Sequence, residues 1–562
     1  MWLLSSKENK VTNELDLKIK FSNHVIYTNE QFFEYQSTSF HVVVFGNLWP
    51  RYDKQKEPIE KNNFNWLISF MISKQLKFID YVKGDFTIFV EIEKILYILN
   101  DHFGFSPIYI NTSSGHVSNS FNSLKIQDII FDNDTIAQHI LYNRTVGQKT
   151  FDKNIENKEG ANLIEFSNNH YKCTTYWDIK NVFSLAKKTY KLQDIIDFSI
   201  ENISFFYKFF DVNKTFITLT GGKDSRSALA ILLNQGIKPI GINYGSSESK
   251  DIVFAKKLAE TIGIECKTIH VKTDTTYYYS LIQELMIEHP MTSIHRAHRY
   301  ASFKEIQTDQ NEFNVLFNGY LGGELLMGIY PDKLVFTEYV LNKIGQDKIE
   351  SFKNYFETDL TKELINQHIK DESLIKNDVD AIFRIGLKHH LQDIHLSKKY
   401  CKYVYPFFLD IDFIERIFNS NYNFTKVNNK SKNLLKRHNL YELNCELQFQ
   451  ASPKLKHIPF AKKGNYTLND YKKGPVFWSI KKVFNHLRER KYPPNFEYDN
   501  HYRNWITEEL EKIILDKKSE IHNYFLVTDA LNTIKNSKNS TFSESEALKF
   551  TRICMFYNYL SK

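Results

Sequence analysis

The sequence predicts an α/β protein with a β-rich first part, a parallel α/β sheet in the middle and a helical last part. Short apolar runs separated by Gly, Asn, Asp and Ser recur over residues 1–185, as in β-rich domains. Strand and helix patterns then alternate from about residue 190 to 345, which indicates a parallel sheet. Helical patterns dominate after that. We therefore expect two domains, residues 1–185 and 190–562, the second with a helical C-terminal extension.

Length, composition and charge exclude several classes of protein. The chain has 562 residues, of which 42% are hydrophobic and 25% charged, as in ordinary globular proteins. Its 73 Lys and Arg against 66 Asp and Glu give a net charge of +7, too weak over this length to imply nucleic acid. The five cysteines form no C-x-x-C pair, and no apolar run approaches the roughly 20 residues of a membrane span. We expect a cytoplasmic protein.

The β-rich part contains five short apolar or alternating segments that are typical of strands. These are His41–Phe45, Phe86–Val90, Ile95–Leu99, Ile108–Ile110 and Asn162–Phe166.

The middle of the chain is organised around the segment from Lys214 to Gln235, K-T-F-I-T-L-T-G-G-K-D-S-R-S-A-L-A-I-L-L-N-Q. Its first residues, Thr215–Leu219, are apolar and β-branched, which favours a buried strand. Gly221 and Gly222 then allow close approach of backbone to a ligand, and a helix follows that Gly236 ends. A strand, a glycine turn and a helix start together favour phosphate binding. The alternative is a tight turn capped by Asp224.

A carboxylate beside a phosphate site repels the phosphate unless a cation lies between them. Asp224 occupies that position, at the start of the helix. It therefore predicts Mg²⁺.

The segment T-G-G-K-D-S resembles the S-G-G-x-D-S pyrophosphate loop of the N-type ATP pyrophosphatases, with Thr220 in place of the first Ser. That group includes asparagine synthetases, β-lactam synthetases and lasso-peptide cyclases. The resemblance implies an adenine nucleotide α-hydrolase-like domain that binds ATP and Mg²⁺. The residues that it assigns to the nucleotide are Leu219, Thr220, Gly221, Gly222, Asp224 and Ser225.

Two segments of the first part resemble the glutaminase half of asparagine synthetases: G-D-F-T-I-F-V (Gly84–Val90) and N-D-H-F-G-F-S-P-I-Y-I (Asn100–Ile110). The resemblance implies an N-terminal-nucleophile (Ntn) sandwich of helices around two sheets. A working glutaminase needs an N-terminal cysteine whose own amine acts as its base. Here Trp2 follows Met1, and the first cysteine is Cys173. We expect this domain to keep the fold and to have lost glutamine hydrolysis.

Two more strands and a helix follow the glycine turn. The strands are Pro239–Tyr244 and Ile264–Val271, and the helix lies between Ser249 and Gly263. By resemblance, the turn at Tyr244 contacts adenine. Asp251 is either a ligand-binding residue or a first-turn carboxylate that complements the helix dipole.

A fourth strand, Asn314–Phe317, leads into N-G-Y-L-G-G-E-L-L-M-G, which resembles S-G-E-G-S-D-E-x-F-G-G of asparagine synthetases. Gly319 matches the glycine frame, so it is assigned to the nucleotide site. The second Mg²⁺ carboxylate of the family falls on Gly323 and is missing, although Glu324 could substitute for it.

Tyrosine at position 320 is what β-lactam synthetases have, where it helps to deprotonate an attacking amine. A phenol needs a lowered pKa or a carboxylate partner for this role. Glu350 and Glu357 are candidates by spacing. The alternative is that Tyr320 packs under the nucleotide.

Three later segments also follow the family order: Arg384–Asp393, Tyr403–Arg416 and Lys454–Tyr466. The last falls where the family has a basic segment whose lysine stabilises charge on pyrophosphate and on the intermediate. By register this is Lys462, with Lys463 second, and the alternative is a solvent-facing pair. Trp505–Leu515 and a capping box at Thr541 predict further helices.

The resemblance implies an ATP-dependent amide ligase that adenylates a carboxylate, releases pyrophosphate and couples the acid to an amine without glutamine. The implied catalytic residues are Asp224, Tyr320 and Lys462. The substrate would be a small molecule or a peptide, as in a peptide macrocyclase or a specialised-metabolite synthetase, with a precursor peptide or a biosynthetic protein as partner. The alternatives are an amidating enzyme of envelope-polysaccharide biosynthesis and a non-catalytic nucleotide-binding scaffold.

Overall fold

A computed structural model of the chain describes most of both predicted domains. The described residues are 1–5, 17–54, 64–124, 129–142, 145–167, 170–184, 189–245, 247–269, 275–289, 291–292, 297–304, 306, 313–327, 363–364, 366–367, 379, 381–423, 435, 438–461, 464–488, 492, 500–523, 525–536 and 554.

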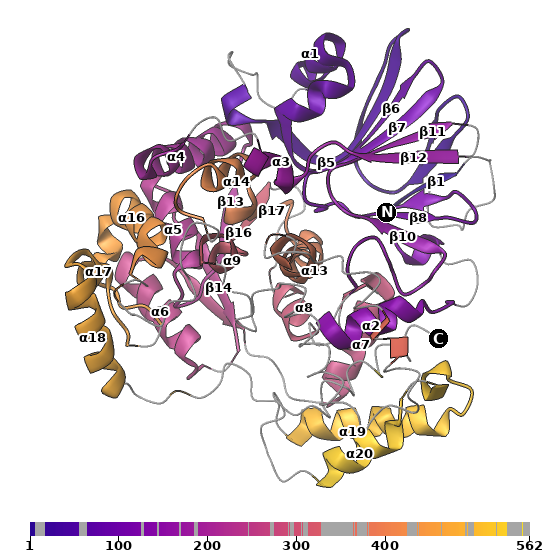
Figure 1. Ribbon diagram of the computed structural model, residues 1–562. Coiled ribbons are helices and arrows are strands. Elements are labelled where there is room, and N and C mark those ends of the chain that lie inside the picture. Colours follow the sequence, from indigo (N-terminus) through magenta and orange to yellow (C-terminus); the bar gives the residue numbers. More distant parts are fainter. Residues whose placement is uncertain are drawn as a thin grey trace.

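The first part of the chain forms two antiparallel sheets, each with six described strands (Figure 1). One has the order β10-β8-β9-β1-β3-β2, with β1 (Trp2–Ser5), β2 (Leu17–Lys20), β3 (Val25–Thr28), β8 (Ile108–Asn111), β9 (Val117–Ser118) and β10 (Ile155–Lys158). The other has the order β12-β11-β7-β6-β5-β4, with β4 (Phe32–Gln36), β5 (Phe40–Pro50), β6 (Val82–Ile92), β7 (Ile95–Asn100), β11 (Asn162–Ser167) and β12 (His170–Thr175). All five predicted strand segments lie within these strands.

The two sheets pack face to face, and helices cover their outer faces. Trp2 and Ile26 of one sheet share an apolar core with Val43 and Phe89 of the other. Helix α1 (Asn65–Lys74) packs on the far side of β5 and β6, and α2 (Asn133–Tyr142) on the far side of the first sheet. This is the layering that the resemblance implies; the assignment to the Ntn class stays a prediction.

The middle of the chain forms a parallel five-stranded sheet with the order β15-β14-β13-β16-β17. Its strands are β13 (Lys214–Thr218), β14 (Ile240–Tyr244), β15 (Cys266–Ile269), β16 (Asn314–Asn318) and β17 (Tyr403–Pro406). Strands β14 and β15 lie on one side of β13, and β16 and β17 lie on the other. The strand order therefore reverses between β13 and β16, and α/β sheets bind ligands in the crevice at such a point.

Helices cover both faces of the parallel sheet. Alternate residues point to opposite sides, Ile217 to the core with α4, α5 and α6, and Phe216 to the core with α7, α8 and α19. The helices of this part are α3 (Ile179–Ser184), α4 (Leu192–Phe209), α5 (Asp224–Asn234), α6 (Lys250–Ile262), α7 (Thr275–Glu288), α8 (Ala297–Lys304) and α9 (Gly322–Met327). Gly236 and Gly263 follow α5 and α6 with φ of 75° and 71°, as expected of glycines that end helices.

The last part is helical, as predicted. Its described helices are α13 (Leu387–Lys398, after a π-helical turn at Ala381–Gly386), α14 (Ile411–Phe418), α16 (Glu442–Ala451), α17 (Leu468–Lys472), α18 (Pro475–Leu487), α19 (Asn500–Leu515) and α20 (Val527–Asn536). Of the predicted helix after Thr541, the described part is Cys554, which is helical and fully buried. None of the helices searched in the described chain has the length and apolarity to cross a bilayer.

The two halves of the chain share a buried interface. The indole of Trp49 on β5 lies against the rings of Phe206 on α4 and Tyr403 on β17, with ring centroids 5.2 and 5.1 Å apart. Beside it, the ammonium of Lys83 contacts the carboxylates of Asp410 and Asp412 at 2.8 and 2.7 Å. These contacts fix the position of the parallel sheet relative to the two antiparallel ones.

Candidate nucleotide site at the edge of the parallel sheet

The predicted glycine turn, residues 219–223, connects the carboxyl end of β13 to the start of α5 and is called the bend below. The hydroxyls of Thr220 and Ser225 lie 3.0 Å apart, and the N–H of Gly222 donates to the Thr220 hydroxyl at 3.2 Å. Leu219 is buried, and its N–H donates to the carbonyl of Ile242 on the neighbouring strand at 2.8 Å. The bend is therefore fixed by its own side chains at the N-terminal end of a helix, where anions are favoured.

Gly221 is required by close packing against the segment Ile458–Ala461. A Cβ at position 221 would overlap the Cβ of Ala461 and lie 2.6 Å from that of Phe254. The N–H of Ala461 donates to the carbonyl of Gly221 at 2.8 Å. Lys462 and Lys463 lie outside the described residues, but the residue that precedes them is bonded to the bend.

Arg226 on α5 attaches the same segment from the other side. Its guanidinium donates to the carbonyls of Ile458 and Pro459 at 2.9 and 2.5 Å and lies 4.5 Å from the ring centroid of Phe460. Burial lowers the pKa of Arg226 to about 9, although Tyr466 and Cys445 act in the opposite direction. Arg226 was not predicted from the sequence, because its partners are more than 200 residues away.

Asp224 is oriented by α16, a helix that sequence reasoning did not connect to the site. Its Oδ1 accepts a hydrogen bond from Nδ2 of Asn444 at 3.2 Å. Asn444 in turn accepts one from the Ser227 hydroxyl at 2.8 Å, and Gln448 donates to the carbonyl of Lys223 at 2.9 Å. Asp224 is half-buried, so it is held by the protein yet reaches the surface of the edge.

The loop after β16 packs directly on the start of α5. A Cβ at Gly319 would lie 2.5 Å from the carbonyl carbon of Asp224, and one at Gly322 would lie 2.9 Å from the Asp224 Cβ. A Cβ at Gly323 would lie 3.8 Å from Oδ2 of Asp224, which is an ordinary contact distance. The two glycine-containing segments that the sequence analysis singled out therefore meet at Asp224, and position 323 faces its carboxylate.

Glu324 and Tyr320 both face His390 on α13. The Oε1 of Glu324 lies 3.6 Å from Nε2 of His390, and the ring of Tyr320 stacks on the imidazole with centroids 4.8 Å apart. Glu350 and Glu357, the expected partners of Tyr320, lie outside the described residues. His390 and Arg299, whose charge interacts with Tyr320, are thus two described titratable neighbours of this tyrosine, and neither could be chosen from spacing alone.

Tyr244 ends β14 beside a basic side chain on α8. The guanidinium carbon of Arg299 lies 6.0 Å from the ring centroid of Tyr244, and Arg299 forms an ion pair with the buried carboxylate of Asp393 on α13. Burial alone would lower the pKa of Arg299, but the charge and hydrogen bond of Asp393, together with Tyr244 and Tyr320, outweigh it and raise the pKa. Asp251 is exposed in the first turn of α6, the position of a carboxylate that complements the helix dipole.

The donor set at this edge fits ATP with Mg²⁺. Mg²⁺ needs one or two protein carboxylates, with phosphates and water completing its octahedron. Asp224 supplies one such carboxylate, and the backbone of Gly323 lies next to it, since a Cβ there would be 3.8 Å from Oδ2. Within the part of the chain that the structure describes, no three His, Cys, Asp or Glu residues gather as a metal site. A metal would therefore be shared between the protein and the nucleotide.

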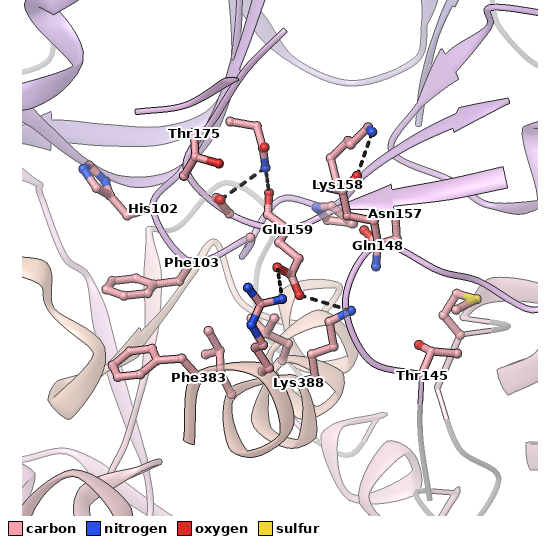
Figure 2. A pocket seen from close by; sticks show the side chains of 18 of the residues that line it. His102, Phe103, Thr145, Gln148, Asn157, Lys158, Glu159, Thr175, Phe383 and Lys388 are labelled. Atoms are coloured by element: carbon pink, nitrogen blue, oxygen red, sulfur yellow. Dashed lines mark hydrogen bonds and ion pairs between the residues drawn. The ribbon is translucent and has the colours of Figure 1, made fainter. Parts of the chain in front are cut away.

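A separate cavity of about 200 Å³ lies between the antiparallel sheets and α13 (Figure 2). Glu159 projects into it toward Lys388 and Arg384, with carboxylate-to-cation distances of 3.8 Å for both. Phe103 and Phe383 form an apolar side of the cavity in the figure. Its charged lining is mostly basic: Lys158, Lys180, Arg384 and Lys388 against Glu159 and Asp178. None of the bend residues lines this cavity. Helix α13 connects the cavity to the nucleotide site, because Lys388 lines the cavity and His390 stacks on Tyr320.

A parallel sheet with a glycine bend at its switch point defines a nucleotide-binding α/β domain. Comparison with protein families agrees: residues 214–303 match the family described as "Queuosine biosynthesis protein QueC". The match contains β13, the bend, α5, β14, α6, β15, α7 and most of α8, and it supports an ATP pyrophosphatase-type domain in this segment.

A solved structure, that of NMN synthetase from Francisella tularensis, is 14% identical to this chain, over 46% of this chain and 97% of the synthetase chain. The TM-score is 0.18, which is too low to indicate a shared fold. No curated protein matches the chain.

Proposed function

We propose that this protein is an ATP-dependent ligase that adenylates a carboxylate and passes the acyl group to an amine. The observation that carries the proposal is the meeting of two segments at Asp224: the glycine bend before α5 and the Gly319–Glu324 loop after β16. Both lie at the carboxyl edge of a parallel sheet, and the bend lies within the segment that matches the QueC family.

In the proposed reaction, the substrate carboxylate attacks the α-phosphorus of ATP and pyrophosphate leaves. The amine then attacks the acyl-adenylate, and AMP leaves as the amide forms. Mg²⁺ held by Asp224 would neutralise charge on the phosphates. The chain itself contributes the bend, whose N–H groups and helix start orient the phosphates, and the lysine segment that Arg226 and Gly221 attach beside it.

Lys462 is the proposed cation for the leaving pyrophosphate. Its support is positional, since the preceding residue, Ala461, donates a backbone hydrogen bond to Gly221. Lys463 stays the second choice. Tyr320 is proposed as the group that accepts the amine proton. His390 stacks on its ring, and the glutamate partners expected from spacing stay a prediction because they lie outside the described residues.

The proposed substrate is a small molecule with a carboxylate. The cavity beside α13 has a volume of about 200 Å³, which is below the roughly 300–1,000 Å³ of drug-sized pockets and therefore favours a small ligand. Its excess of basic side chains favours an anion. We found no described feature that favours a peptide substrate, a precursor peptide or a biosynthetic protein partner, and these stay proposals. The independence from glutamine is also a proposal.

The test is substitution of Asp224. Purified protein is incubated with ATP, Mg²⁺ and a panel of carboxylic acids, and AMP, pyrophosphate and adenylated acid are measured by mass spectrometry and by pyrophosphate–ATP exchange. We expect Asp224→Ala to abolish the products while leaving the protein folded at the assay temperature, as circular dichroism would check. Asp529→Ala, at another first-turn Asp (of α20), is the matched control and should leave them unchanged.

Product formation by Asp224→Ala equal to that of the wild type would contradict the proposal. ATP binding without turnover for any acid would instead favour the scaffold alternative. Adenylate formation followed by amidation of a sugar acid would favour the envelope-polysaccharide alternative.

A further inference from the structure

Helix α18 presents an apolar face to solvent. Six large apolar side chains are exposed on it, with relative exposures of 38–80%: Val476, Phe477, Ile480, Val483, Phe484 and Leu487. They recur at the spacing of one helix face, over three turns. A contiguous exposed apolar surface of this kind usually marks a site that binds another protein or a membrane.

The orientation of α18 is fixed by its opposite face. Trp478 is fully buried, and its indole meets the rings of Tyr466 and Tyr441 with centroids 5.4 and 5.8 Å apart. At about 100° per residue, the exposed residues centre on the side opposite Trp478. The apolar face therefore cannot turn inward without removing Trp478 from the core.

The charged residues of α18 itself and of the residues just before and after it are all basic, although Lys472 pairs with Glu446 on α16 at 2.7 Å and Lys482 lies over the ring of Trp478 on the buried side. From Tyr471 to Arg488 the sequence contains no Asp or Glu, and its basic residues are Lys472, Lys473, Lys481, Lys482 and Arg488. Two of these cations lie over rings of the apolar face: Nζ of Lys473 is 4.5 Å from the Phe477 centroid, and the guanidinium carbon of Arg488 is 4.1 Å from that of Phe484. Cations thus border the apolar stripe, as in helices that lie in a membrane interface.

The location of α18 suits a flat surface. It runs along the outer margin of the molecule, on the side away from the antiparallel sheets (Figure 1). A second copy docked through the same face would bring two clusters of basic residues together, which costs free energy. A single exposed helix with a basic rim matches an anionic lipid surface instead, because the apolar side chains enter the acyl boundary while Lys and Arg contact the headgroups.

We propose that α18 docks this protein peripherally on membranes that contain anionic phospholipid. The inference is independent of the proposed ligase activity, since it depends on α18 and its flanking lysines alone. In this arrangement α18 lies in the plane of the membrane surface.

The experiment is co-sedimentation of the full-length protein with vesicles of phosphatidylcholine alone or mixed with phosphatidylglycerol. We expect binding to the mixed vesicles that weakens with added salt, and little binding to phosphatidylcholine. The double variant Ile480→Glu, Phe484→Glu should lower the partition coefficient roughly tenfold or more. Ile72→Glu on α1 is the matched control, because Ile72 is 66% exposed and Ile480 65%.

The far-ultraviolet circular dichroism and unfolding temperature of each variant are measured alongside. Lys473→Gln, a milder change at the rim, should lower binding without affecting the fold, and so keeps the test decisive if the double variant unfolds. The proposal is overturned if the protein stays in the supernatant with phosphatidylglycerol vesicles at low salt, or if Ile72→Glu has the same effect as the double variant. It is also overturned if sedimentation finds a dimer that the double variant dissociates, because the face then belongs to a second copy.

Discussion

At the scale of single residues, Gly323 is the position where this chain departs most from the family pattern that it resembles. The family has a metal-binding carboxylate there, and this chain has none. The backbone accepts a Cβ there, because it would meet Oδ2 of Asp224 at 3.8 Å and Met327 at 3.7 Å, both ordinary contacts. The missing ligand is therefore a difference in chemistry rather than in backbone.

We expect Gly323→Asp to fold normally and to bind Mg²⁺ with a nonhydrolysable ATP analogue more tightly than the wild type, since a second carboxylate shares the cation. Isothermal titration calorimetry with and without Mg²⁺ measures this. Gly322→Ala is the contrast: its Cβ would lie 2.6 Å from the buried ring of Phe408 and should cost about 1–3 kcal/mol of stability. Unchanged Mg²⁺ dependence in Gly323→Asp would argue against a metal at Asp224.

His102 makes the stability of the protein depend on pH. The side chain is 6% exposed, and burial, assisted by the charge of Arg51, lowers its pKa to about 3. In the unfolded chain a histidine titrates near 6.5, so the unfolded state binds more protons between these values. The stability that His102 contributes is therefore present above pH 6.5 and is lost as pH falls toward 3.

Urea unfolding at a series of pH values should show stability falling by up to about 1.4 kcal/mol per pH unit for this histidine between roughly pH 6 and 4. His102→Gln should flatten that slope while lowering stability at neutral pH. An identical slope in the variant would mean that His102 is protonated in the folded protein. His395, whose pKa burial likewise lowers to about 3, accounts for part of the remaining slope.

At the scale of elements, the attachment of Ile458–Ala461 to α5 decides whether the bend and the lysine segment act together. Arg226 is fully buried, and its described hydrogen bonds go to two carbonyls of that segment. Removing the guanidinium leaves these carbonyls without their charged donor. We expect Arg226→Met to cost about 2–3 kcal/mol of the free energy of unfolding.

Hydrogen exchange of the Ala461 amide, which donates to Gly221, measures the local effect, and exchange there should accelerate in Arg226→Met. Lys208→Met on the exposed side of α4 is the control and should change neither quantity. If Ala461 stays protected in Arg226→Met, the segment is held by packing alone.

The elements of the parallel sheet could be predicted because each is encoded locally. One short stretch of sequence contains the apolar run Thr215–Leu219, the paired glycines and Gly236. The structure has β13, the bend and α5 in this stretch, and the ends of β13 differ from the prediction by one residue. The third strand is shorter in the described chain than predicted, Cys266–Ile269 instead of Ile264–Val271. Strand ends are set by pairing with neighbours, and β15 pairs with β14 over only four residues.

The partners of the site could not be predicted in the same way. Asn444 lies 220 residues from Asp224 in the sequence, and nothing in E-L-N-C-E-L distinguishes it from any other helical asparagine. His390 and Arg299 reach the site from α13 and α8 for the same reason: the crossing of the helices over the sheet, and not local pattern, brings them there. Glu324 follows the position of the missing carboxylate and is the predicted substitute for it; its Oε1 lies 3.6 Å from Nε2 of His390.

At the scale of the whole molecule, a buried ionic cluster joins the two halves. Lys83 of β6 contacts Asn202, Asp410 and Asp412, and the Arg51 guanidinium contacts Asp412 at 2.6 Å. Burial alone would raise the pKa of Asp412, but the Arg51 and Lys83 charges outweigh it, so the carboxyl stays ionised. The two cations belong to the first part of the chain and the two carboxylates to the second, so the ion pairs exist only while the two parts are in contact.

We expect Lys83→Met to destabilise the protein by about 3–5 kcal/mol, because it leaves two buried carboxylates short of a cation. Urea unfolding checks this, and the double variant Lys83→Met, Asp410→Asn should recover part of the loss. For the same reason, residues 190–562 produced alone should be poorly soluble, as Asp410 and Asp412 would lose their partners. A well-folded, monomeric fragment would show that the cluster is dispensable.

The interlock of Gly221 with Ala461 has an implication for how this sequence can vary. A methyl group added at Gly221 would overlap Ala461 and Phe254, although these residues lie far from it along the chain. A replacement of the glycine therefore requires changes at both neighbours. Random mutagenesis with selection for activity should recover substitutions at 221 together with changes around 461 and 254.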